Sequence, residues 1–353
     1  MKFGFFLIFL LAFSTVAYAQ SGRVKPEETP TPKPGFRPSV VYLPTQEKTA
    51  SVPRPSPTPK KPDDPDDVIT VDATLIPIPV SILDVAGHAV TNLKLSDFEL
   101  QVDGKTVEIT EMSRSETPIR LAMLFDNSSS VMIARDFEKE AAIKFFRRMI
   151  RPDKDLAALY SVATVTRLEQ RFTPDILSLT NAIEMFAMPV GATALLDGIS
   201  LSANYLREVS GRRVIVIVSD GDDTASDTTL DEAMKDLQFA NAQVYVVKTT
   251  DFENYKRTGS RGGNANLRQL AAERRMSEIA RQTGGSVYSP VDERELDDAF
   301  RQISAELSQQ YILSYYPDSE PEKRGEFRNI TLTVKGRSNL SVRTRKGYYV
   351  PRK

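Results

Sequence analysis

The sequence contains no cysteine and only one histidine, His88, in 353 residues. Without cysteine the chain has no disulfide, no thiol nucleophile and no thiolate metal site. Its stability must therefore come from a buried core, and the roughly 280 residues that follow a proline-rich stretch are enough to form one. The single histidine follows the turn pair Ala86-Gly87, where we expect a turn residue rather than a catalyst.

The chain also lacks an excess of charge of either sign. It carries 46 basic and 47 acidic residues, for a net charge of −1. This balance gives no electrostatic reason to expect nucleic acid as a partner. Short basic clusters occur at Arg212-Arg213, Arg274-Arg275 and Arg343–Lys346. Because acidic or apolar residues are interleaved with them, we expect these clusters to lie on solvated faces.

The first nineteen residues have the pattern of a secretory signal peptide. Lys2 is followed by the apolar run Phe3–Phe13, and Ala17-Tyr18-Ala19 forms a cleavage site before Gln20. The run is shorter than the ~20 residues of a membrane-spanning helix, which favours cleavage over anchoring and predicts no transmembrane segment afterwards. We expect an exported protein, in the periplasm, at the cell surface or secreted. The absence of cysteine is more typical of a bacterial envelope than of an animal extracellular space.

Residues 20–67 are rich in proline, holding twelve of the 22 prolines of the chain. Closely spaced prolines prevent both helix and strand pairing, so we expect a disordered linker of extended character. It could be a spacer or a tail without a function of its own.

Strand patterns occupy both ends of the remaining chain. In the N-terminal β segment, at 68–117, the pair Asp103-Gly104 separates two alternating stretches and predicts a β-hairpin. The C-terminal β segment, at 309–353, alternates polar and apolar residues over 310–316, 327–334 and 340–345. Because a small sheet needs a partner to bury one face, we expect the two segments to pack together as a β-sandwich-like module.

Between these segments, residues 118–308 alternate strand and helix patterns. The predicted strands are 119–125, 156–163, 213–219, 243–248 and 286–289. The predicted helices are 131–149, 175–187, 194–208, 229–239, 267–283 and 293–308. Such alternation predicts an α/β domain with a doubly wound, mostly parallel sheet, inserted into the β module. Ligands of such sheets bind at the carboxyl ends of the strands.

Oxygen-bearing side chains gather at three of these predicted strand or helix ends. Asp126, Ser128 and Ser130 follow the first strand, Thr193 precedes a helix, and Asp220 follows the uninterrupted apolar run Val214–Val218. Capping of a helix explains one such residue, not three in alternation. Carboxylate and hydroxyl oxygens suit hard cations, so the set predicts a site for Mg²⁺, or for Mn²⁺ or Ca²⁺.

This set, in this order, resembles the metal-ion-dependent adhesion site of the von Willebrand factor type A family. The resemblance covers about residues 118–308 and implies a role for each residue: Asp126 orients or binds the metal, Ser128, Ser130 and Thr193 are hydroxyl ligands, and Asp220 is a distal carboxylate. The flanking pieces LKLSDFELQVDGKTVEI and YILSYYP are similar to those of an exported bacterial group with this domain, first described in acidobacteria.

The resemblance implies a protein-binding module of adhesion or scaffold type, rather than an enzyme. Its cation would bridge to an Asp or Glu carboxylate of a protein partner. Two alternatives remain open: a metal-dependent hydrolase, and a structural envelope protein with a vestigial site. The residues Asp222, Asp223, Asp227 and Asp231, which follow Asp220, could bind a second cation but are expected to form a solvated loop and a helix cap.

Overall fold

The computed structural model describes residues 75–114, 117–133, 135–261, 266–317 and 325–350. The predicted signal peptide and linker, at 1–67, lie outside these residues. No helix within the described ranges is long and apolar enough to cross a bilayer.

The centre of the fold is a six-stranded sheet with the order β10-β9-β8-β5-β6-β7. All neighbours are parallel except β7, which is antiparallel to β6. β8 holds the uninterrupted apolar run, lies between β5 and β9, and has buried residues on both faces. The strands are β5 (Ile119–Asp126), β6 (Leu156–Val162), β7 (Arg167–Thr173), β8 (Arg212–Ser219), β9 (Gln243–Lys248) and β10 (Val287–Tyr288).

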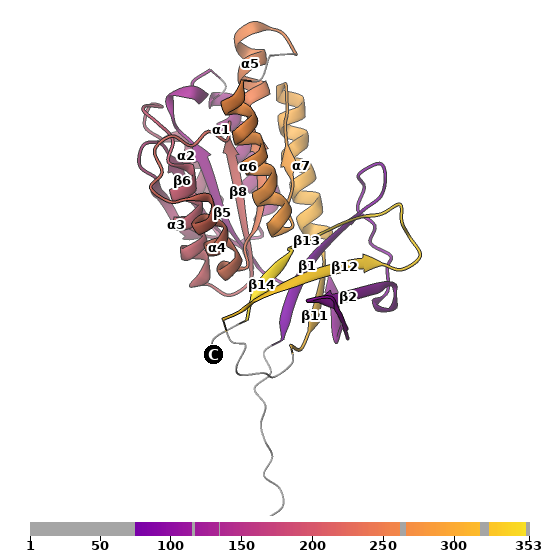
Figure 1. Ribbon diagram of the computed structural model, residues 1–353. Coiled ribbons are helices and arrows are strands. Elements are labelled where there is room, and N and C mark those ends of the chain that lie inside the picture. Colours follow the sequence, from indigo (N-terminus) through magenta and orange to yellow (C-terminus); the bar gives the residue numbers. More distant parts are fainter. Residues whose placement is uncertain (1–74, 115–116, 134, 262–265, 318–324, 351–353) are drawn as a thin grey trace, which may run out of the picture. The chain divides into compact units, whose positions relative to one another are not determined.

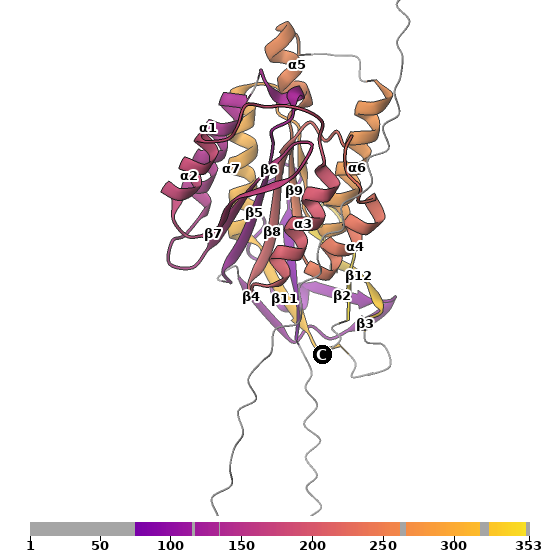
Figure 2. The ribbon, with the colours of Figure 1, turned by 90° about the vertical axis from the view of Figure 1, so that its left-hand side faces the viewer.

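Helices cover both faces of this sheet (Figures 1 and 2). On one face lie α1 (Arg135–Met149), α2 (Ile176–Glu184) and α7 (Glu293–Gln309), which share an apolar core with the sheet. On the other face α3 (Leu195–Arg207), α4 (Leu230–Ala240) and α6 (Leu267–Thr283) form a second core. A further helix, α5 (Thr250–Thr258), lies at the carboxyl end of β9 and inserts Phe252 into the first core.

The two ends of the described chain form two antiparallel sheets. One has the order β13-β1-β11-β4, and the other has the order β14-β12-β2-β3. A single apolar core joins them, with Ile78, Leu100, Tyr311 and Leu332 among its members. The strands are β1 (Ile76–Leu83), β2 (Phe98–Val102), β3 (Lys105–Val107), β4 (Glu111–Arg114), β11 (Tyr311–Tyr315), β12 (Phe327–Val334), β13 (Ser341–Thr344) and β14 (Gly347–Tyr349). The predicted fold class, an α/β domain inserted between flanking antiparallel strands, is therefore confirmed.

Local sequence explains the hairpin between β2 and β3. Asp103 and Gly104 both have positive φ angles, of 50° and 78°. Such angles are required at both central positions of a two-residue type I′ turn, and Asp-Gly is among the pairs that adopt them most readily. Asp103 also accepts hydrogen bonds from the backbone N–H of Asn329 (2.9 Å) and from Arg328 (2.8 Å), so the turn is fixed to β12.

Three elements of the structure differ from the prediction. β7 was not predicted because it is a half-exposed edge strand with a polar sequence, RLEQRFT. α5 was not predicted because only Phe252 of its nine residues is buried. α1 starts at Arg135 rather than at 131, since Ser129–Val131 forms a separate 3-10 helix (η2) first.

The prediction of solvated basic clusters is wrong for two arginines. Arg212 and Arg345 are only 6% and 8% exposed. The guanidinium of Arg212 donates to the carbonyl oxygen of Leu307 (3.0 Å) and that of Arg345 to the carbonyl oxygen of Pro77 (2.8 Å). Both side chains lie where the α/β domain meets the terminal strands, an environment that their spacing in the sequence does not reveal.

Candidate functional site

The last residue of β5, Asp126, provides a buried carboxylate at the carboxyl edge of the sheet. β5 and β8 are parallel neighbours with Phe125 opposite Val218, so Asp126 lies beside Ser219. The Ser219 hydroxyl donates to Asp126 Oδ2 (2.6 Å), and the backbone N–H of Ser128 donates to Oδ1 (2.9 Å). Both carboxylate oxygens are thus held in one orientation by groups of the protein.

Ser128 and Ser130 follow on the turn that leads towards α1. Ser128 is buried and Ser130 is exposed, and their hydroxyl oxygens lie 2.9 Å apart. Ser128 occupies the N-cap position of η2, but its side chain makes no capping hydrogen bond. Plain helix capping therefore does not account for Ser128, whose hydroxyl faces that of Ser130 instead.

Asp220 follows β8 and lines a small cavity together with Ser130. The cavity has a volume of about 160 Å³, and Ser130, Asp220, Thr250 and Glu253 contribute to its lining. Asp220 Oδ1 accepts a hydrogen bond from the backbone N–H of Asp222 (2.9 Å), and its carbonyl oxygen accepts one from the Thr250 hydroxyl (3.1 Å). The two predicted carboxylates therefore belong to one edge, on neighbouring strands.

Thr193 lies on the loop before α3, and it is only 3% exposed. Its backbone N–H donates to the Thr224 hydroxyl (3.1 Å), and its carbonyl oxygen accepts from the N–H groups of Thr224 (2.8 Å) and Ala225 (3.0 Å). These bonds tie the loop of Thr193 to the loop that follows Asp220. Direct hydrogen bonds thus join Asp126, Ser128 and Ser130, whereas Thr193 is held at the edge through its backbone.

The electrostatics of this edge favour the arrival of positive charge. Burial, followed by the nearby charge of Asp220, raises the pKa of Asp126 to about 6, although hydrogen bonds from Ser219 and Ser128 lower it in part. A carboxylate that is both desolvated and close to a second carboxylate is destabilised in its charged form. A cation between the two would relieve this destabilisation.

Two further carboxylates near the site, Glu138 of α1 and Glu253 of α5, were not predicted from the sequence. Glu138 of α1 is completely buried, and neither of its side-chain oxygens makes a hydrogen bond of regular geometry within the described part of the chain. Burial, then the charges of Glu253 and Asp126, raise the pKa of Glu138 well above its ordinary value, and the Thr249 hydroxyl offsets this only in part. One signal was available: Glu138 precedes the buried residues Ala141 and Ala142 by three and four positions, so it lies on the buried face of α1.

The acidic residues after Asp220 have structural contacts. Asp223 Oδ1 accepts the backbone N–H groups of Leu195 (2.8 Å) and Leu196 (3.2 Å), at the start of α3. Asp222 forms an ion pair with Arg268 (2.8 Å). Asp231 lies in the first turn of α4, which Thr229 caps. These contacts agree with the expected loop and helix-cap role.

The residues at the edge fit a hard divalent cation by their chemistry. No group of three or more His, Cys, Asp or Glu side chains suited to a metal gathers within the described ranges. The predicted set holds only two carboxylates, Asp126 and Asp220, so hydroxyls would have to supply the other protein ligands. The paired hydroxyls of Ser128 and Ser130 beside a destabilised carboxylate meet that requirement, and an all-oxygen set suits Mg²⁺, Mn²⁺ or Ca²⁺.

Comparisons with known proteins find likeness in structure alone. No protein-family model matches the sequence, and the comparison with curated proteins finds no match. An aerotolerance-related membrane protein from Bacteroides fragilis is 18% identical, with a TM-score of 0.41 over 53% of this chain and 98% of its own. The SpRpn10 VWA domain is 16% identical, with a TM-score of 0.40 over 52% of this chain and 94% of its own.

A third similar structure is the vWF domain of the type V pili tip protein Mfa5 from Porphyromonas gingivalis. It is 12% identical, with a TM-score of 0.40 over 53% of this chain and 94% of its own. One of these three is named a VWA domain and one a vWF domain. Every TM-score is below 0.5, so these likenesses carry no argument about the function of this chain.

Proposed function

We propose that the protein is an exported binding module that engages another protein through a divalent cation. The residues that would hold the cation are Asp126, Ser128, Ser130, Thr193 and Asp220. The observation that carries the proposal is the carboxylate of Asp126, which is buried, close to Asp220, and followed by two serine hydroxyls 2.9 Å apart. A bound cation would supply a positive charge and an open coordination position for a carboxylate of the partner.

The chain's own residues would make this contact specific. Ser219 and the Ser128 N–H fix the orientation of Asp126, so its carboxylate needs no reorganisation when the cation arrives. Ser128 and Ser130 contribute neutral oxygens, so these two ligands add no negative charge that would repel a carboxylate of the partner. Metal binding and partner binding would therefore be interdependent.

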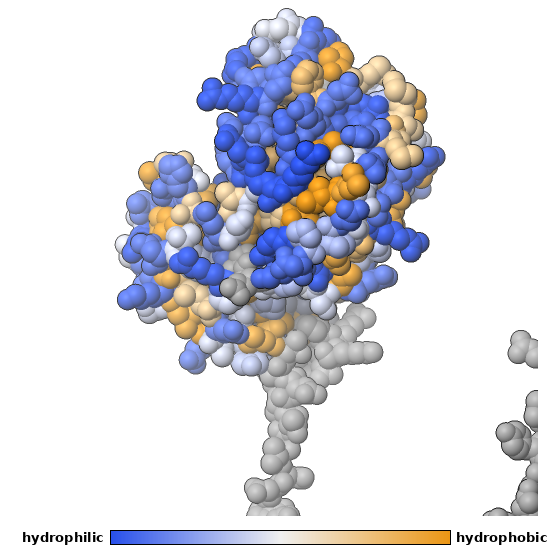
Figure 3. All heavy atoms as spheres, turned by 180° about the vertical axis from the view of Figure 1, so that it is seen from behind, coloured by the Kyte–Doolittle hydropathy of each residue, from blue (hydrophilic) through white to orange (hydrophobic). Residues whose placement is uncertain are grey.

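Exposed apolar side chains around the same edge support a protein as partner. Met132 and Ile133 follow the serine turn and are 53% and 51% exposed, while Met188 and Val190 on the loop before α3 are 66% and 62% exposed. The two segments adjoin, since Val190 N–H donates to the Asn127 carbonyl oxygen (3.2 Å). Figure 3 shows one face of the molecule, on which apolar patches lie among mostly hydrophilic residues. Such a combination is typical of protein interfaces.

Capture of a partner tests the proposal. The full chain would be immobilised and exposed to envelope extract with Mg²⁺, with chelator, and as the Asp126→Asn variant. We expect a partner that binds with Mg²⁺, elutes with chelator and is not captured by the variant. The identified partner should lose binding when one Asp or Glu at its contact surface is changed to Asn or Gln.

A matched control is Asp227→Asn, which removes the same charge from an exposed position seven residues after Asp220. This variant should capture the partner normally. Capture that persists in chelator would contradict the proposal. Metal-dependent hydrolysis of phosphoester, ester or peptide substrates that disappears in Asp126→Asn would favour the hydrolase instead.

A further inference from the structure

A second site candidate lies at the opposite edge of the central sheet. A cavity of about 500 Å³ opens at the amino end of β8, where the α/β domain meets the terminal strands. Three arginines line it, Arg212 and Arg213 from β8 and Arg345 from the turn between β13 and β14. We call it the arginine cavity. Its volume is within the range of small-molecule binding pockets, about 300–1,000 Å³.

Arg345 presents its guanidinium group to this cavity, and only some of the nitrogens of that group donate hydrogen bonds within the described part of the chain. Its guanidinium donates to the Asn241 side-chain oxygen and to the Pro77 carbonyl oxygen. Its Nε is buried and has no hydrogen-bond partner among the residues that the structure describes. Its guanidinium carbon lies 5.3 Å from the centre of the Tyr348 ring, which also lines the cavity.

The other two arginines donate to neutral oxygens, and Arg212 also lies near the charge of Asp155. Arg212 donates to the Leu307 carbonyl oxygen and to the Gln310 side chain. Arg213 donates to the carbonyl oxygens of Val209 (3.0 Å) and Ala240 (2.8 Å). No aspartate or glutamate is among the described residues that line the cavity. Burial lowers the pKa of Arg212 and that of Arg345 to about 10 each, so both remain charged at neutral pH.

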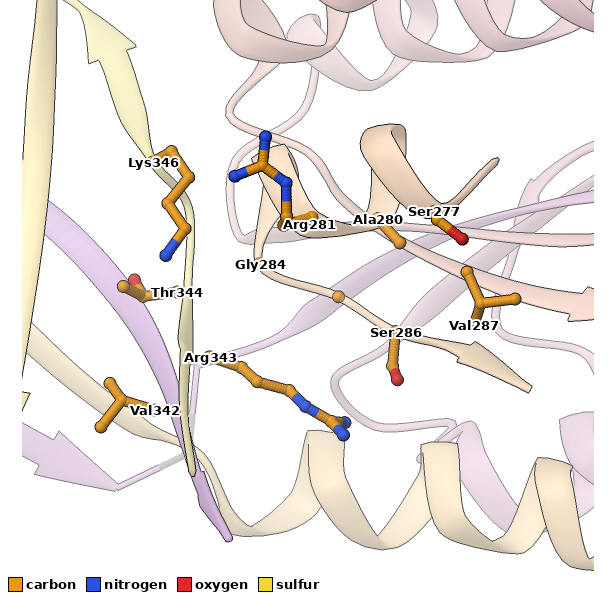
Figure 4. Close-up of a pocket in the computed structure, with 11 residues that line it drawn as sticks. Ser277, Ala280, Arg281, Gly284, Ser286, Val287, Val342, Arg343, Thr344 and Lys346 are labelled. Atoms are coloured by element: carbon orange, nitrogen blue, oxygen red, sulfur yellow. The ribbon is translucent and has the colours of Figure 1, made fainter. Parts of the chain in front are cut away.

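In a neighbouring cavity, two arginines form ion pairs with carboxylates of the protein. It has a volume of about 280 Å³, and Arg281, Arg343 and Lys346 reach it from the two sides of the same junction (Figure 4). There Arg281 is paired with Glu278 (2.7 Å) and Arg343 with Glu306 (3.1 Å). Arg281 and Arg343 thus each have a carboxylate partner, whereas Arg345 donates to neutral oxygens among the residues that the structure describes.

We propose that the arginine cavity binds a small organic anion, with its carboxylate or phosphate at the arginines and its apolar or aromatic body against the tyrosine and aliphatic lining. Three guanidinium groups held by carbonyl and amide oxygens form a preorganised anion site, since a guanidinium binds such groups in fixed geometry. Tyr348, Tyr349 and Ile312 supply the apolar wall. A ligand without an anionic group would leave the buried charge of Arg345 without a negative partner, which is unfavourable.

Calorimetric titration of the full chain in chelator tests this proposal without any contribution from a metal. The probes are 4-phenylbutyrate and phenyl phosphate, with 4-phenylbutan-1-ol as the neutral counterpart of the first. We expect one saturable site for at least one of the two anions and none for the alcohol. Arg345→Gln should weaken anion binding about tenfold or more, as expected for the loss of a hydrogen bond to a charged group.

Two further variants separate binding from folding. Ser210→Trp, at the exposed rim of the arginine cavity, keeps all three arginines but should block entry and abolish binding. Arg343→Gln removes the same charge as Arg345→Gln from the neighbouring paired cavity and should leave binding unchanged. Absence of binding by both anions at millimolar concentration would overturn the proposal. Equal binding of the alcohol, or anion binding that is unchanged in Ser210→Trp, would overturn it as well.

Discussion

Replacing Asp126 by Asn is expected to stabilise the protein at neutral pH when metal is absent. Asp126 is buried beside Asp220, and both features penalise its charged form. Asn has nearly the same shape and no charge. It can still accept the Ser128 N–H, and its amide can donate to the Ser219 oxygen in place of the present bond.

The size of the effect follows from the pKa of Asp126, which is about 6 in the folded protein and 3.8 ordinarily. The folded state therefore binds the proton more tightly than the unfolded state. Above pH 6 the charged carboxylate lowers the free energy of unfolding by about 3 kcal/mol, and this penalty disappears as the pH falls from 6 to below 4. A less favourable hydrogen bond in the variant would cost about 1 kcal/mol. We expect a net stabilisation of about 2 kcal/mol at pH 7.5.

Urea denaturation in chelator at pH 7.5 and pH 4.5 measures the difference in free energy of unfolding between Asp126→Asn and the wild type. Asp227→Asn is the control for loss of surface charge. The advantage of Asp126→Asn should shrink at pH 4.5. Saturating Mg²⁺ should stabilise the wild type alone, by about 2.7 kcal/mol at a hundredfold excess over the dissociation constant. An Asp126→Asn variant that is less stable than the wild type at pH 7.5 in chelator would refute the reasoning.

Three more predictions follow from the packing. Truncation after Gln309 removes β11 and β13, the two neighbours of β1. Limited proteolysis of the truncated chain should therefore cleave within 76–114. A protease-resistant truncated chain would show that the terminal strands do not depend on each other. Glu138→Gln should raise the midpoint of urea denaturation at pH 7 in chelator, because burial and the charge of Glu253 destabilise the charged form of Glu138. A lowered midpoint would contradict this explanation. Gly285→Ala should destabilise the protein by about 2 kcal/mol or more, since the added methyl would overlap the Val244 carbonyl oxygen. An unchanged melting temperature would exclude that close approach.

The central sheet was predictable because its strands carry strong local signals. The uninterrupted β-branched run of β8 predicts a central strand covered on both faces, and β8 is central and buried, between β5 and β9. The Asp103-Gly104 hairpin was predictable because few other pairs adopt its positive φ angles. β7 and α5 could not be predicted, since each depends on contacts with the rest of the fold rather than on its own apolar pattern.

Site residues were also predictable only where the local sequence determines their position. Asp126 and Asp220 were predicted at one edge because parallel strands end at the same edge, and the structure places them on neighbouring strands there. Glu138 was missed because its sequence context, DFEKE, resembles a solvated helix face. The arginine cavity was missed because Arg212 and Arg345 are 133 positions apart and meet only when the terminal strands pack on the α/β domain.

Titration with Mn²⁺ tests the central claim most directly. Calorimetry on the full chain should show one site that is lost in Asp126→Asn and in Asp220→Asn, and that is kept in Asp227→Asn. Circular dichroism should show the same fold in all four proteins. Absence of binding at millimolar Mn²⁺, or binding that is unchanged in both site variants, would contradict a metal centre at this edge of the sheet.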